Sequence, residues 1–401
     1  MSISSYLPFF AINLLCLAVA LAILRANPFY RREVLDAKPG RAEMLDGLRG
    51  FLALGVFFNH AVNNYYYNLD GFWTVGAAPH YELTGQIGVS LFFMITGFLF
   101  WGRVLRTHGS LDVVPLYLSR IRRIVPMYLV SVLMALAVVA ALSGFSLRTG
   151  PASLIKELRA WFSFGFMEYG ALNGFSDGHY INPVYWTLAF EWLFYISLPF
   201  LALFAKPAWG VALFIVALVF GLRVPVTLNF VAGAIAALLV HKRWLGGRLA
   251  DPMWTPVALA ALALTFLLPS GYGRVPVITL FVFFLCIVHG NSLFGLLRSA
   301  PAKLLGMISY SFYLLHAIVV FVVVRVVASL VPIGQLGDSR YWLVASAAAV
   351  IAVLLSAFTY RYVEHPFLSM KGDLPASLPA YLSWLPYAAT LRRRQASRSG
   401  R

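Results

Sequence analysis

The chain has 401 residues, of which 61% are hydrophobic and only 11% are charged. Soluble domains contain about 45–50% apolar and about 25% charged residues, so this composition leaves too little charge to cover a water-soluble globule of this size. At about 20 residues for each membrane-crossing helix, the chain is long enough for ten or eleven spans joined by short loops. The composition therefore predicts an all-α, polytopic integral membrane protein with about 10–11 transmembrane helices, and it excludes a large soluble domain.

The net charge is +16, from 31 basic and 15 acidic side chains. A nucleic-acid-binding surface gathers basic residues on one soluble face together with stacking aromatic side chains, whereas here they stand in loops between apolar runs. We therefore interpret the charge as membrane topology and expect no nucleic-acid partner. Cys16 and Cys286 both lie inside apolar runs, where neither a disulfide framework nor a metal-ligand spacing can be recognised, so no metal is expected.

Apolar runs follow one another along the chain, and each is long enough, or nearly so, to cross about 30 Å of hydrocarbon as a helix. They cover residues 6–24, 47–66, 85–102, 124–142, 184–205, 208–222, 224–240, 253–269, 275–290, 304–330 and 341–361. The first run is expected to be an uncleaved anchor, because no basic residue precedes it and a positive cluster follows it. In the long loop 143–183, the stretch 154–166 mixes charged and aromatic residues and is either an interfacial helix or a solvated loop.

If the chain changes sides after each run, most of the 31 basic residues fall on one side. The positive-inside rule makes that side cytoplasmic, which places the C-terminus inside the cell. Residues 1–40 are then an additional N-terminal membrane anchor with a basic cytoplasmic linker. Residues 41–368 form the main transmembrane domain, and residues 369–401 form a basic cytoplasmic tail.

A few ionisable side chains lie within the apolar runs, where their energetic cost makes them candidates for function. Counting about 1.5 Å per residue, His60 lies about 20 Å from the inner end of its run, and His316 lies at a similar depth. The run that carries Glu191 enters the membrane from the opposite side, and Glu191 lies at nearly the same depth as the two histidines. Each of them alone could be a residue that packs two helices together. Their shared depth instead favours one common site, so His60, Glu191 and His316 are predicted as catalytic residues.

Arginines stand at the predicted cytoplasmic ends of the runs 47–66 and 124–142. Arg49 precedes His60 by eleven positions, which on a helix returns to nearly the same face three turns later. Arg120 and Arg123 share one helix face at i, i+3 spacing, a geometry that can hold phosphate groups bidentately. By itself, this pair is more simply interpreted as an anchor under the positive-inside rule.

Together, these motifs resemble those of the membrane-bound acyltransferase-3 family. The likeness covers about residues 41–368, and its elements occur in the family's order. They are Leu45-Asp46-Gly47-Leu48-Arg49-Gly50 followed by His60, the pair Arg120 and Arg123, the segment Trp186 to Tyr195, the run Ser309 to His316, and Tyr362-Val363-Glu364-His365-Pro366. One departure is Glu191-Trp192, because family members often carry two adjacent acidic residues at that place.

The resemblance implies an acyl-CoA-dependent O-acyltransferase in the bacterial inner membrane. It implies transfer of an acyl group, usually acetyl, from cytoplasmic acyl-CoA to a hydroxyl of an extracytoplasmic carbohydrate or related acceptor. It also suggests that Arg49, Arg120 and Arg123 bind the phosphates of acyl-CoA. His60 would act as general base, or as a nucleophile that forms an acyl-histidine, and Glu191 would orient its imidazole as a carboxylate does in hydrolase triads.

The alternative function is that of a multi-pass transporter or a glycan flippase. Many membrane spans with ionisable residues near the midplane also describe such proteins. The sequence shows neither repeated halves nor paired interrupted helices, which speaks against this alternative. The identity of the acceptor stays open, and the outer loop at Asp177-Gly178-His179-Tyr180 is a candidate for selecting it.

Overall fold

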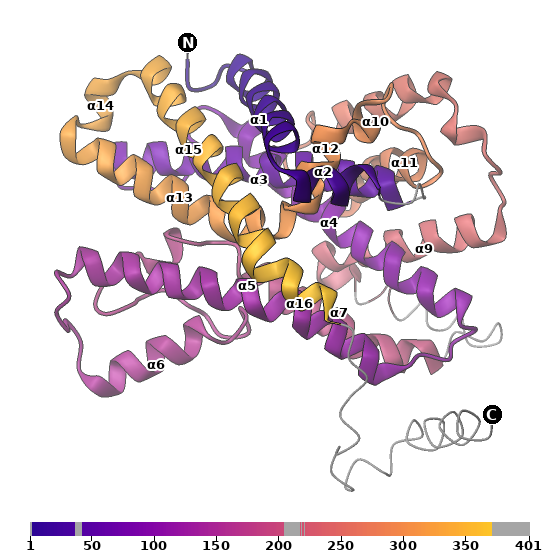
Figure 1. The fold of residues 1–401 in the computed structure, drawn as a ribbon, viewed down its shortest axis with the longest axis horizontal. Coiled ribbons are helices and arrows are strands. Elements are labelled where there is room, and N and C mark those ends of the chain that lie inside the picture. The colour runs from indigo at the N-terminus through magenta and orange to yellow at the C-terminus, as the bar shows by residue number, and fades with distance from the viewer. Residues whose placement is uncertain (1, 37–41, 204–216, 218, 220, 371–401) are drawn as a thin grey trace, which may run out of the picture.

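The computed structural model describes residues 2–36, 42–203, 217, 219 and 221–370, and the regular elements in these ranges are helices (Figure 1). Six helical segments of this described part are long and apolar enough to cross a membrane. They are α1 (Leu7–Ala26), α4 (Pro79–Arg106), α5 (Val113–Leu142), the segment Pro225–Lys242 that contains α9 (Leu228–Lys242), α13 (Ser309–Leu330), and the segment Asp338–Ser369 that begins with α15 (Asp338–Thr359). The prediction of an all-α polytopic membrane protein is confirmed.

Further helices correspond to other predicted runs. The run 47–66 lies within the 29-residue helix α3 (Ala42–Asp70), which is more polar because it carries Asp46, Arg49, His60 and several asparagines. Shorter apolar helices fall on the runs 184–205, 253–269 and 275–290, and they are α7 (Trp186–Leu203), α10 (Thr255–Thr265) and α11 (Arg274–Val288). The run 208–222 lies mostly outside the described residues, as do residues 371–401 of the predicted tail.

For two predicted segments, the structure shows where the helices begin and end. The run 304–330 is divided at Ile308 into α12 (Ala300–Met307) and α13. The stretch 154–166 contains a helix, α6 (Pro151–Trp161), rather than a fully irregular loop. The remaining short elements are α2 (Pro28–Leu35), η1 (Gly178–Tyr180), η2 (Pro225–Thr227), η3 (Arg248–Ala250), η4 (Pro252–Trp254), η5 (Leu296–Arg298), α14 (Ile333–Leu336), the π-helical turn η6 (Tyr360–Glu364) and α16 (His365–Ser369).

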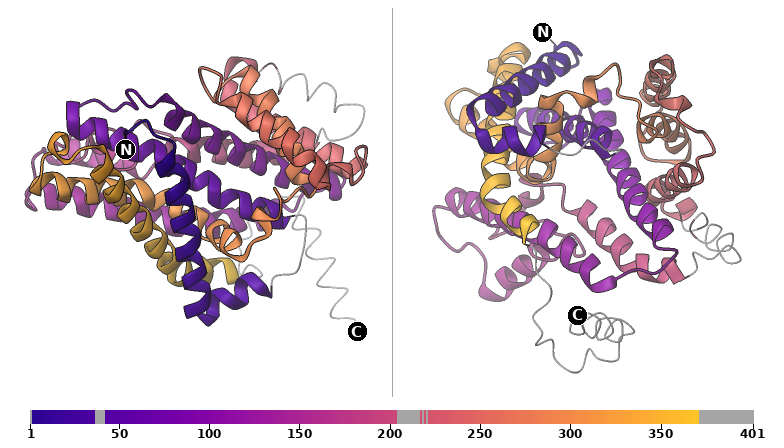
Figure 2. Two further views of the ribbon diagram at one scale, coloured as in Figure 1. Left: turned by 90° about the horizontal axis from the view of Figure 1, so that it is seen from above. Right: turned by 45° about the vertical axis from the view of Figure 1, so that its right-hand side comes forward.

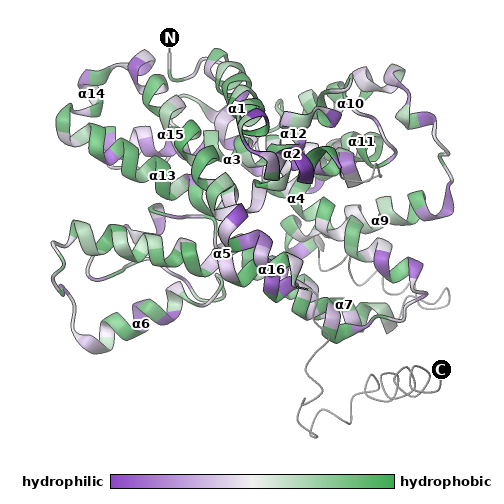
Figure 3. Cartoon of the chain, in the orientation of Figure 1, coloured by the Kyte–Doolittle hydropathy of each residue, from purple (hydrophilic) through white to green (hydrophobic). Residues whose placement is uncertain are grey.

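The outer surface of the bundle suits lipid. Hydrophobic residues run along the long helices, and hydrophilic residues gather around α2, α16 and the helix ends (Figure 3). Large apolar side chains on these helices are exposed, including Leu133 at 57%, Leu330 at 78% and Phe358 at 60%. Such a surface would be an aggregation hazard in water, whereas hydrocarbon solvates it.

α1 packs as part of the bundle. Every fourth residue of this helix is buried, namely Ile12, Cys16, Ala20 and Leu24, and this stripe faces α12 and α15. The opposite side of the bundle is formed by α9, α10 and α11, which lie together beside α4 (Figure 2). The retention of α1 as an uncleaved anchor stays a prediction.

The start of α3 approaches the segment η5 to α12 so closely that only glycine fits between them. A Cβ atom on Gly306 would lie 1.6 Å from the carbonyl oxygen of Asp46, and one on Gly47 would lie 2.1 Å from the carbonyl oxygen of Leu297. Small residues permit this kind of backbone contact between membrane helices. The glycines of the first motif therefore hold Asp46 and Arg49 next to the break between α12 and α13.

Candidate functional site

Two histidines from distant parts of the chain meet inside the bundle. The Nδ1 atom of His60 on α3 lies 2.9 Å from the Nε2 atom of His316 on α13, and the two rings are within 5° of parallel. His316 is completely buried, and His60 is 8% exposed. The two imidazoles that the sequence placed at one depth are thus in direct contact.

The hydrogen bonds of this pair determine which nitrogen of each neutral ring carries the proton. Nδ1 of His316 lies 3.0 Å from the carbonyl oxygen of Phe312, and a carbonyl can only accept, so this Nδ1 carries the hydrogen. A neutral imidazole has one donor and one acceptor nitrogen, so Nε2 of His316 accepts a hydrogen bond from Nδ1 of His60. The Nε2 atom of His60 is then left with a free lone pair, which is the arrangement of a general base or a nucleophile.

His60 lines a cavity of about 310 Å³, which we call the histidine cavity. This volume lies at the lower end of the range of about 300–1,000 Å³ that is typical of small-molecule sites. The lining combines polar and aromatic side chains, among them Asn59, Asn63, Glu82, Gln86, Trp73, Trp186, Tyr272 and Tyr313. Such a lining can bind a ligand through both hydrogen bonds and ring contacts.

The loop at Asp177 to Tyr180, which the sequence predicts to lie outside, borders this cavity. The Tyr180 ring stacks on Trp73, with ring centroids 4.5 Å apart, and the hydroxyl of Tyr67 on α3 donates to Asp177 over 2.8 Å. Burial lowers the pKa of His179, against the opposing effect of the Asp177 carboxylate. The loop therefore supports Trp73, and through it the wall of the histidine cavity.

A second cavity, of about 120 Å³, is lined by Arg49, Arg120 and Arg123 together with Glu191. We call it the arginine cavity. Arg120 lies over the Phe100 ring at 5.0 Å, and Arg123 lies over the Tyr310 ring at 5.5 Å. The structure thus brings together, from α3 and α5, the residues that the resemblance implied for phosphate binding.

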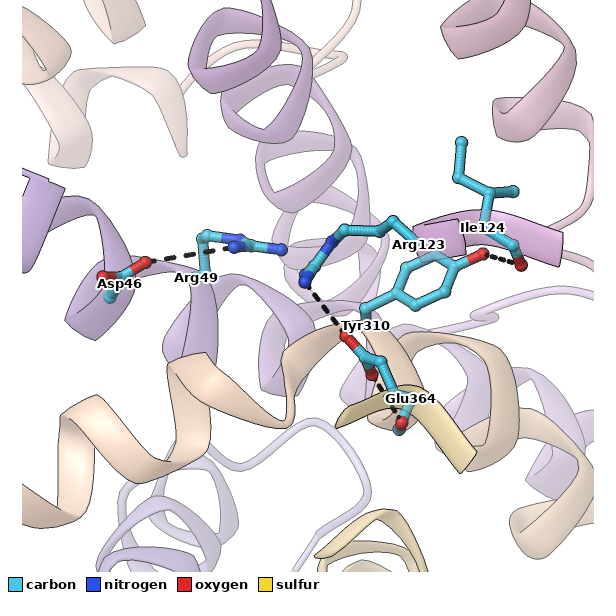
Figure 4. Close-up of polar contacts among 7 residues, drawn as sticks. Asp46, Arg49, Arg123, Ile124, Tyr310 and Glu364 are labelled. Carbon is cyan, nitrogen blue, oxygen red and sulfur yellow. Dashed lines mark hydrogen bonds and ion pairs between the residues drawn. The ribbon is translucent and has the colours of Figure 1, made fainter. Parts of the chain in front are cut away.

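Two of these guanidinium groups converge. Figure 4 shows the side chains of Arg49 and Arg123 pointing toward one another. Each forms an ion pair with an acidic side chain, since Arg49 lies 4.0 Å from Asp46 and Arg123 lies 3.0 Å from Glu364. Like charges at short range repel each other, and an anion between them would relieve that repulsion.

Buried polar atoms without partners also face this region. Within the described part of the chain, Nη2 of Arg123 and Oγ of Ser309 are buried and have no hydrogen-bond partner, and both residues line the arginine cavity. An unsatisfied buried donor costs about 1–3 kcal/mol. A polar ligand in the arginine cavity would recover this cost.

Glu191 belongs to the arginine cavity. Its Oε1 atom accepts a hydrogen bond of 2.6 Å from the hydroxyl of Tyr195 and a longer one of 3.5 Å from Thr96. The Nδ1 contact of His60 is with His316. In this structure His316 therefore makes the orienting contact that the resemblance suggested for Glu191.

Glu364 pairs with a residue of the arginine cavity, although the sequence did not single it out by itself. Its side chain is completely buried, its Oε1 pairs with Arg123, and its Oε2 accepts a hydrogen bond of 2.8 Å from Ser311 (Figure 4). The π-helical turn η6 places it there, and such turns occur frequently at functional sites. The only signal in the sequence was an acidic residue within the last motif of the resemblance.

The two cavities have a common wall. Tyr313 and Val89 line both of them. Tyr313 is one turn before His316 on α13, and its hydroxyl lies 3.0 Å from Oγ1 of Thr187. Tyr313 therefore lies where the arginine cavity and the histidine cavity adjoin.

No group of three or more His, Cys, Asp or Glu side chains within the described ranges is arranged to hold a metal ion. The two cysteines, Cys16 and Cys286, are free and buried. The side chains that line the two cavities supply imidazole, guanidinium, carboxylate, hydroxyl and amide groups.

Comparison with known proteins identifies a matching family and several relatives of this chain. Residues 43–361 match the family described as the acyltransferase domain. The chain is 27% identical to the acyltransferase MdmB of Streptomyces mycarofaciens, over 83% of this chain and 93% of that protein. It is 25% identical to nodulation protein 10 of Rhizobium leguminosarum bv. viciae, over 84% and 96%. It is 24% identical to the O-acetyltransferase OatA of Staphylococcus aureus, over 84% of this chain and 58% of that protein. No solved structure matches the chain significantly.

Proposed function

The chain belongs to the acyltransferase-domain family, and from that premise we propose that it is an O-acyltransferase that moves an acyl group from acyl-CoA to a hydroxyl of a carbohydrate or related acceptor. The observation that carries the proposal is the pair His60 and His316 at the wall of a polar cavity. This pair leaves the Nε2 lone pair of His60 free to take a proton. Acetyl is the proposed acyl group, since OatA, a relative over most of this chain, is named an O-acetyltransferase.

In the proposed reaction, the acceptor lies in the histidine cavity with its hydroxyl next to His60. Nε2 of His60 takes the hydroxyl proton as the oxygen attacks the thioester carbonyl carbon, and His316 stabilises the resulting imidazolium through the 2.9 Å contact. The carbon–sulfur bond then breaks, and the imidazolium returns the proton to the sulfur. The products are the ester and free coenzyme A.

The arginine cavity is the proposed donor site. Coenzyme A carries phosphate groups, and Arg49, Arg120 and Arg123 supply charge-assisted donors for such groups. The converging guanidinium groups and the unpartnered polar atoms of Arg123 and Ser309 support this assignment. Glu191 accepts from Tyr195, and its proposed role is to fix the wall of this cavity.

The distribution of charge supports one orientation in the membrane. We propose that the arginine cavity opens to the cytoplasm, where acyl-CoA is present, and that the histidine cavity faces the outside. The excess of basic residues on one side supports this assignment under the positive-inside rule. The proposed location is a bacterial inner membrane with a cytoplasmic C-terminus, and the proposed acyltransferase domain comprises residues 41–368.

Deletion and complementation in the native host test the proposal, because the cell supplies both donor and acceptor. Ester-linked acyl groups are released from the envelope glycans with mild alkali and measured by mass spectrometry. We expect them to disappear on deletion, to return with the intact chain, and to stay absent with an equally abundant His60→Ala chain. Full restoration by His60→Ala, or an unchanged ester content after deletion, would contradict the proposal.

A further inference from the structure

Tyr313 occupies the position where the proposed donor and acceptor must meet. It lines both the histidine cavity and the arginine cavity, and its ring centroid lies 6.1 Å from that of His316. The other residue shared by the two cavities is Val89, which has no polar side-chain atom. The phenol of Tyr313 is therefore the hydrogen-bonding side chain that the two cavities share.

The hydrogen bonds around Thr187 show where the phenol proton points. Oγ1 of Thr187 lies 2.8 Å from the carbonyl oxygen of Val184, and it can only donate to that oxygen. A hydroxyl has a single hydrogen, so the 3.0 Å contact between Thr187 and Tyr313 must be donated by Tyr313. The phenol thus presents an O–H group at the wall that Thr187 and Tyr313 form in the arginine cavity.

A hydrogen-bond donor at this place would accelerate acyl transfer. When the acceptor oxygen adds to the thioester, negative charge develops on the carbonyl oxygen, and a preorganised hydrogen bond to that oxygen contributes strongly to catalysis. In the proposed function the arginines bind the phosphate groups of the donor. His60 donates to His316, and His316 donates to the Phe312 carbonyl. Neither the arginines nor the histidines provide an O–H or N–H group at the wall between the histidine cavity and the arginine cavity.

On the basis of the proposed function, we propose that the hydroxyl of Tyr313 donates a hydrogen bond to the thioester carbonyl oxygen during acyl transfer and is thus a further catalytic residue. The proton stays on the phenol throughout. The phenol hydrogen bond switches from Thr187 to the carbonyl oxygen as the acceptor oxygen–carbon bond forms, and it switches back when the carbon–sulfur bond breaks. His60 alone carries the acceptor proton to the leaving sulfur.

The test uses the full-length protein in membrane vesicles from the deletion host, which contain unmodified acceptor. Radiolabelled acetyl-CoA is titrated, and label in alkali-labile ester is measured. We expect Tyr313→Phe to lower the maximal rate about 100- to 1,000-fold and to change the apparent KM for acetyl-CoA by less than about twofold. A matched control is Tyr341→Phe, because the Tyr341 hydroxyl is buried and donates to the backbone of Ala61, and Tyr341 lines neither cavity.

Two further measurements separate catalysis from structure. A ketone analogue of acetyl-CoA, with CH₂ in place of sulfur, should bind Tyr313→Phe and the wild type with equal Kd, which shows that the variant is folded. Thr187→Val removes the resting partner of the phenol, together with the local hydrogen bond from Thr187 to the Val184 carbonyl, and should reduce the rate at most a few-fold. An equal loss in Thr187→Val and Tyr313→Phe would assign the hydroxyl to helix packing and overturn the inference.

The failure of this inference can be distinguished from failure of the proposed function. If wild type transfers label, His60→Ala does not, and Tyr313→Phe retains more than about a third of the rate, only the role of Tyr313 is refuted. If wild type itself transfers no label in vesicles that contain the acceptor, the acyltransferase reaction with acetyl-CoA is refuted, and the role of Tyr313 falls with it.

Discussion

Nδ1 of His60 lies 2.9 Å from Nε2 of His316, and His316 is itself fixed by the carbonyl oxygen of Phe312. The hydrogen bonds from His60 to His316 and from His316 to Phe312, which we call the histidine relay, connect α3 to α13. The orientation of the His60 ring therefore depends on a second helix. His316 orients His60 as a carboxylate orients the histidine of a hydrolase triad, but His316 is a neutral imidazole and not an acid. The two histidines are therefore expected to differ in importance.

The first prediction concerns that difference. His60→Ala removes the proposed base and should lower the maximal rate of ester formation about 100- to 10,000-fold. His316→Ala removes only the orienting partner and should lower it about 10- to 100-fold. His316→Gln should recover part of that loss, because the glutamine carbonyl can accept from Nδ1 of His60. The rates are measured at saturating acyl-CoA.

A histidine outside both cavities serves as the control for this series. His241 lies at the end of α9 and lines neither the histidine cavity nor the arginine cavity, so His241→Ala should keep the wild-type rate. If His316→Ala is as active as the wild type, His316 is a packing residue and the histidine relay has no part in catalysis.

Counting residues along a helix was enough to place His60 and His316 at one depth, because the rise per residue is nearly constant. The same count placed Glu191 in that layer, but it did not show which way the side chain points. Rotation about the helix axis and the choice of neighbours are set by packing. Glu191 consequently contacts Tyr195, on its own helix, rather than His60.

The roles of Glu364 and Tyr313 could not be predicted for a related reason. Glu364 acquires its position from the π-helical turn η6 and its partner Arg123 from α5, and no local pattern specifies that pairing. Tyr313 is one of many aromatic residues in an apolar run, and only the two cavities on either side distinguish it. The long helices, by contrast, follow directly from the apolar runs.

The second prediction tests the donor site. Arg120→Ala removes a guanidinium from the arginine cavity, and a hydrogen bond to a charged group contributes about 1.5–3 kcal/mol. We therefore expect the apparent KM for acyl-CoA to rise about 10- to 100-fold, with a smaller change in the maximal rate. The measurement is a titration of acetyl-CoA at fixed acceptor.

Arg122 is the matched control for Arg120, because it is on the same helix and has the same charge. Its Nη1 donates to the carbonyl oxygen of Met370 over 2.7 Å, and it does not line the arginine cavity. Arg122→Ala should leave the KM unchanged. An equal KM for Arg120→Ala and Arg122→Ala would assign Arg120 to membrane anchoring.

The third prediction concerns the ion pair of Arg123 and Glu364. Removing one partner of a buried ion pair leaves an uncompensated charge and costs about 3–5 kcal/mol, so Arg123→Ala and Glu364→Ala should each lower the thermal unfolding midpoint in detergent. The double variant leaves neither charge unpaired and should lose less stability than the sum of the single variants. Strict additivity would show that the pair contributes no coupling.

The fourth prediction concerns the contact between α3 and α12. A Cβ on Gly306 would lie 1.6 Å from the carbonyl oxygen of Asp46, so Gly306→Ala must push the two backbones apart. Overpacking of this kind costs about 1–3 kcal/mol or more, and the unfolding midpoint should fall. Gly247→Ala is the control, because no heavy atom lies within 4 Å of a Cβ at that position. Equal midpoints for the two variants would mean that the helices do not approach each other as described.

The fifth prediction tests the orientation in the membrane. Cys16 and Cys286 are buried, so a cysteine introduced at an exposed site can be labelled selectively by a membrane-impermeant maleimide. Phe145 is 85% exposed in the predicted outer loop, and Trp244 is 70% exposed in a predicted cytoplasmic loop. Phe145→Cys should react in intact cells whose outer envelope has been made permeable, whereas Trp244→Cys should react only after the inner membrane is opened. The reverse pattern would put the arginine cavity on the outside, away from cytoplasmic acyl-CoA, and would contradict the proposed direction of transfer even if the catalytic residues were correct.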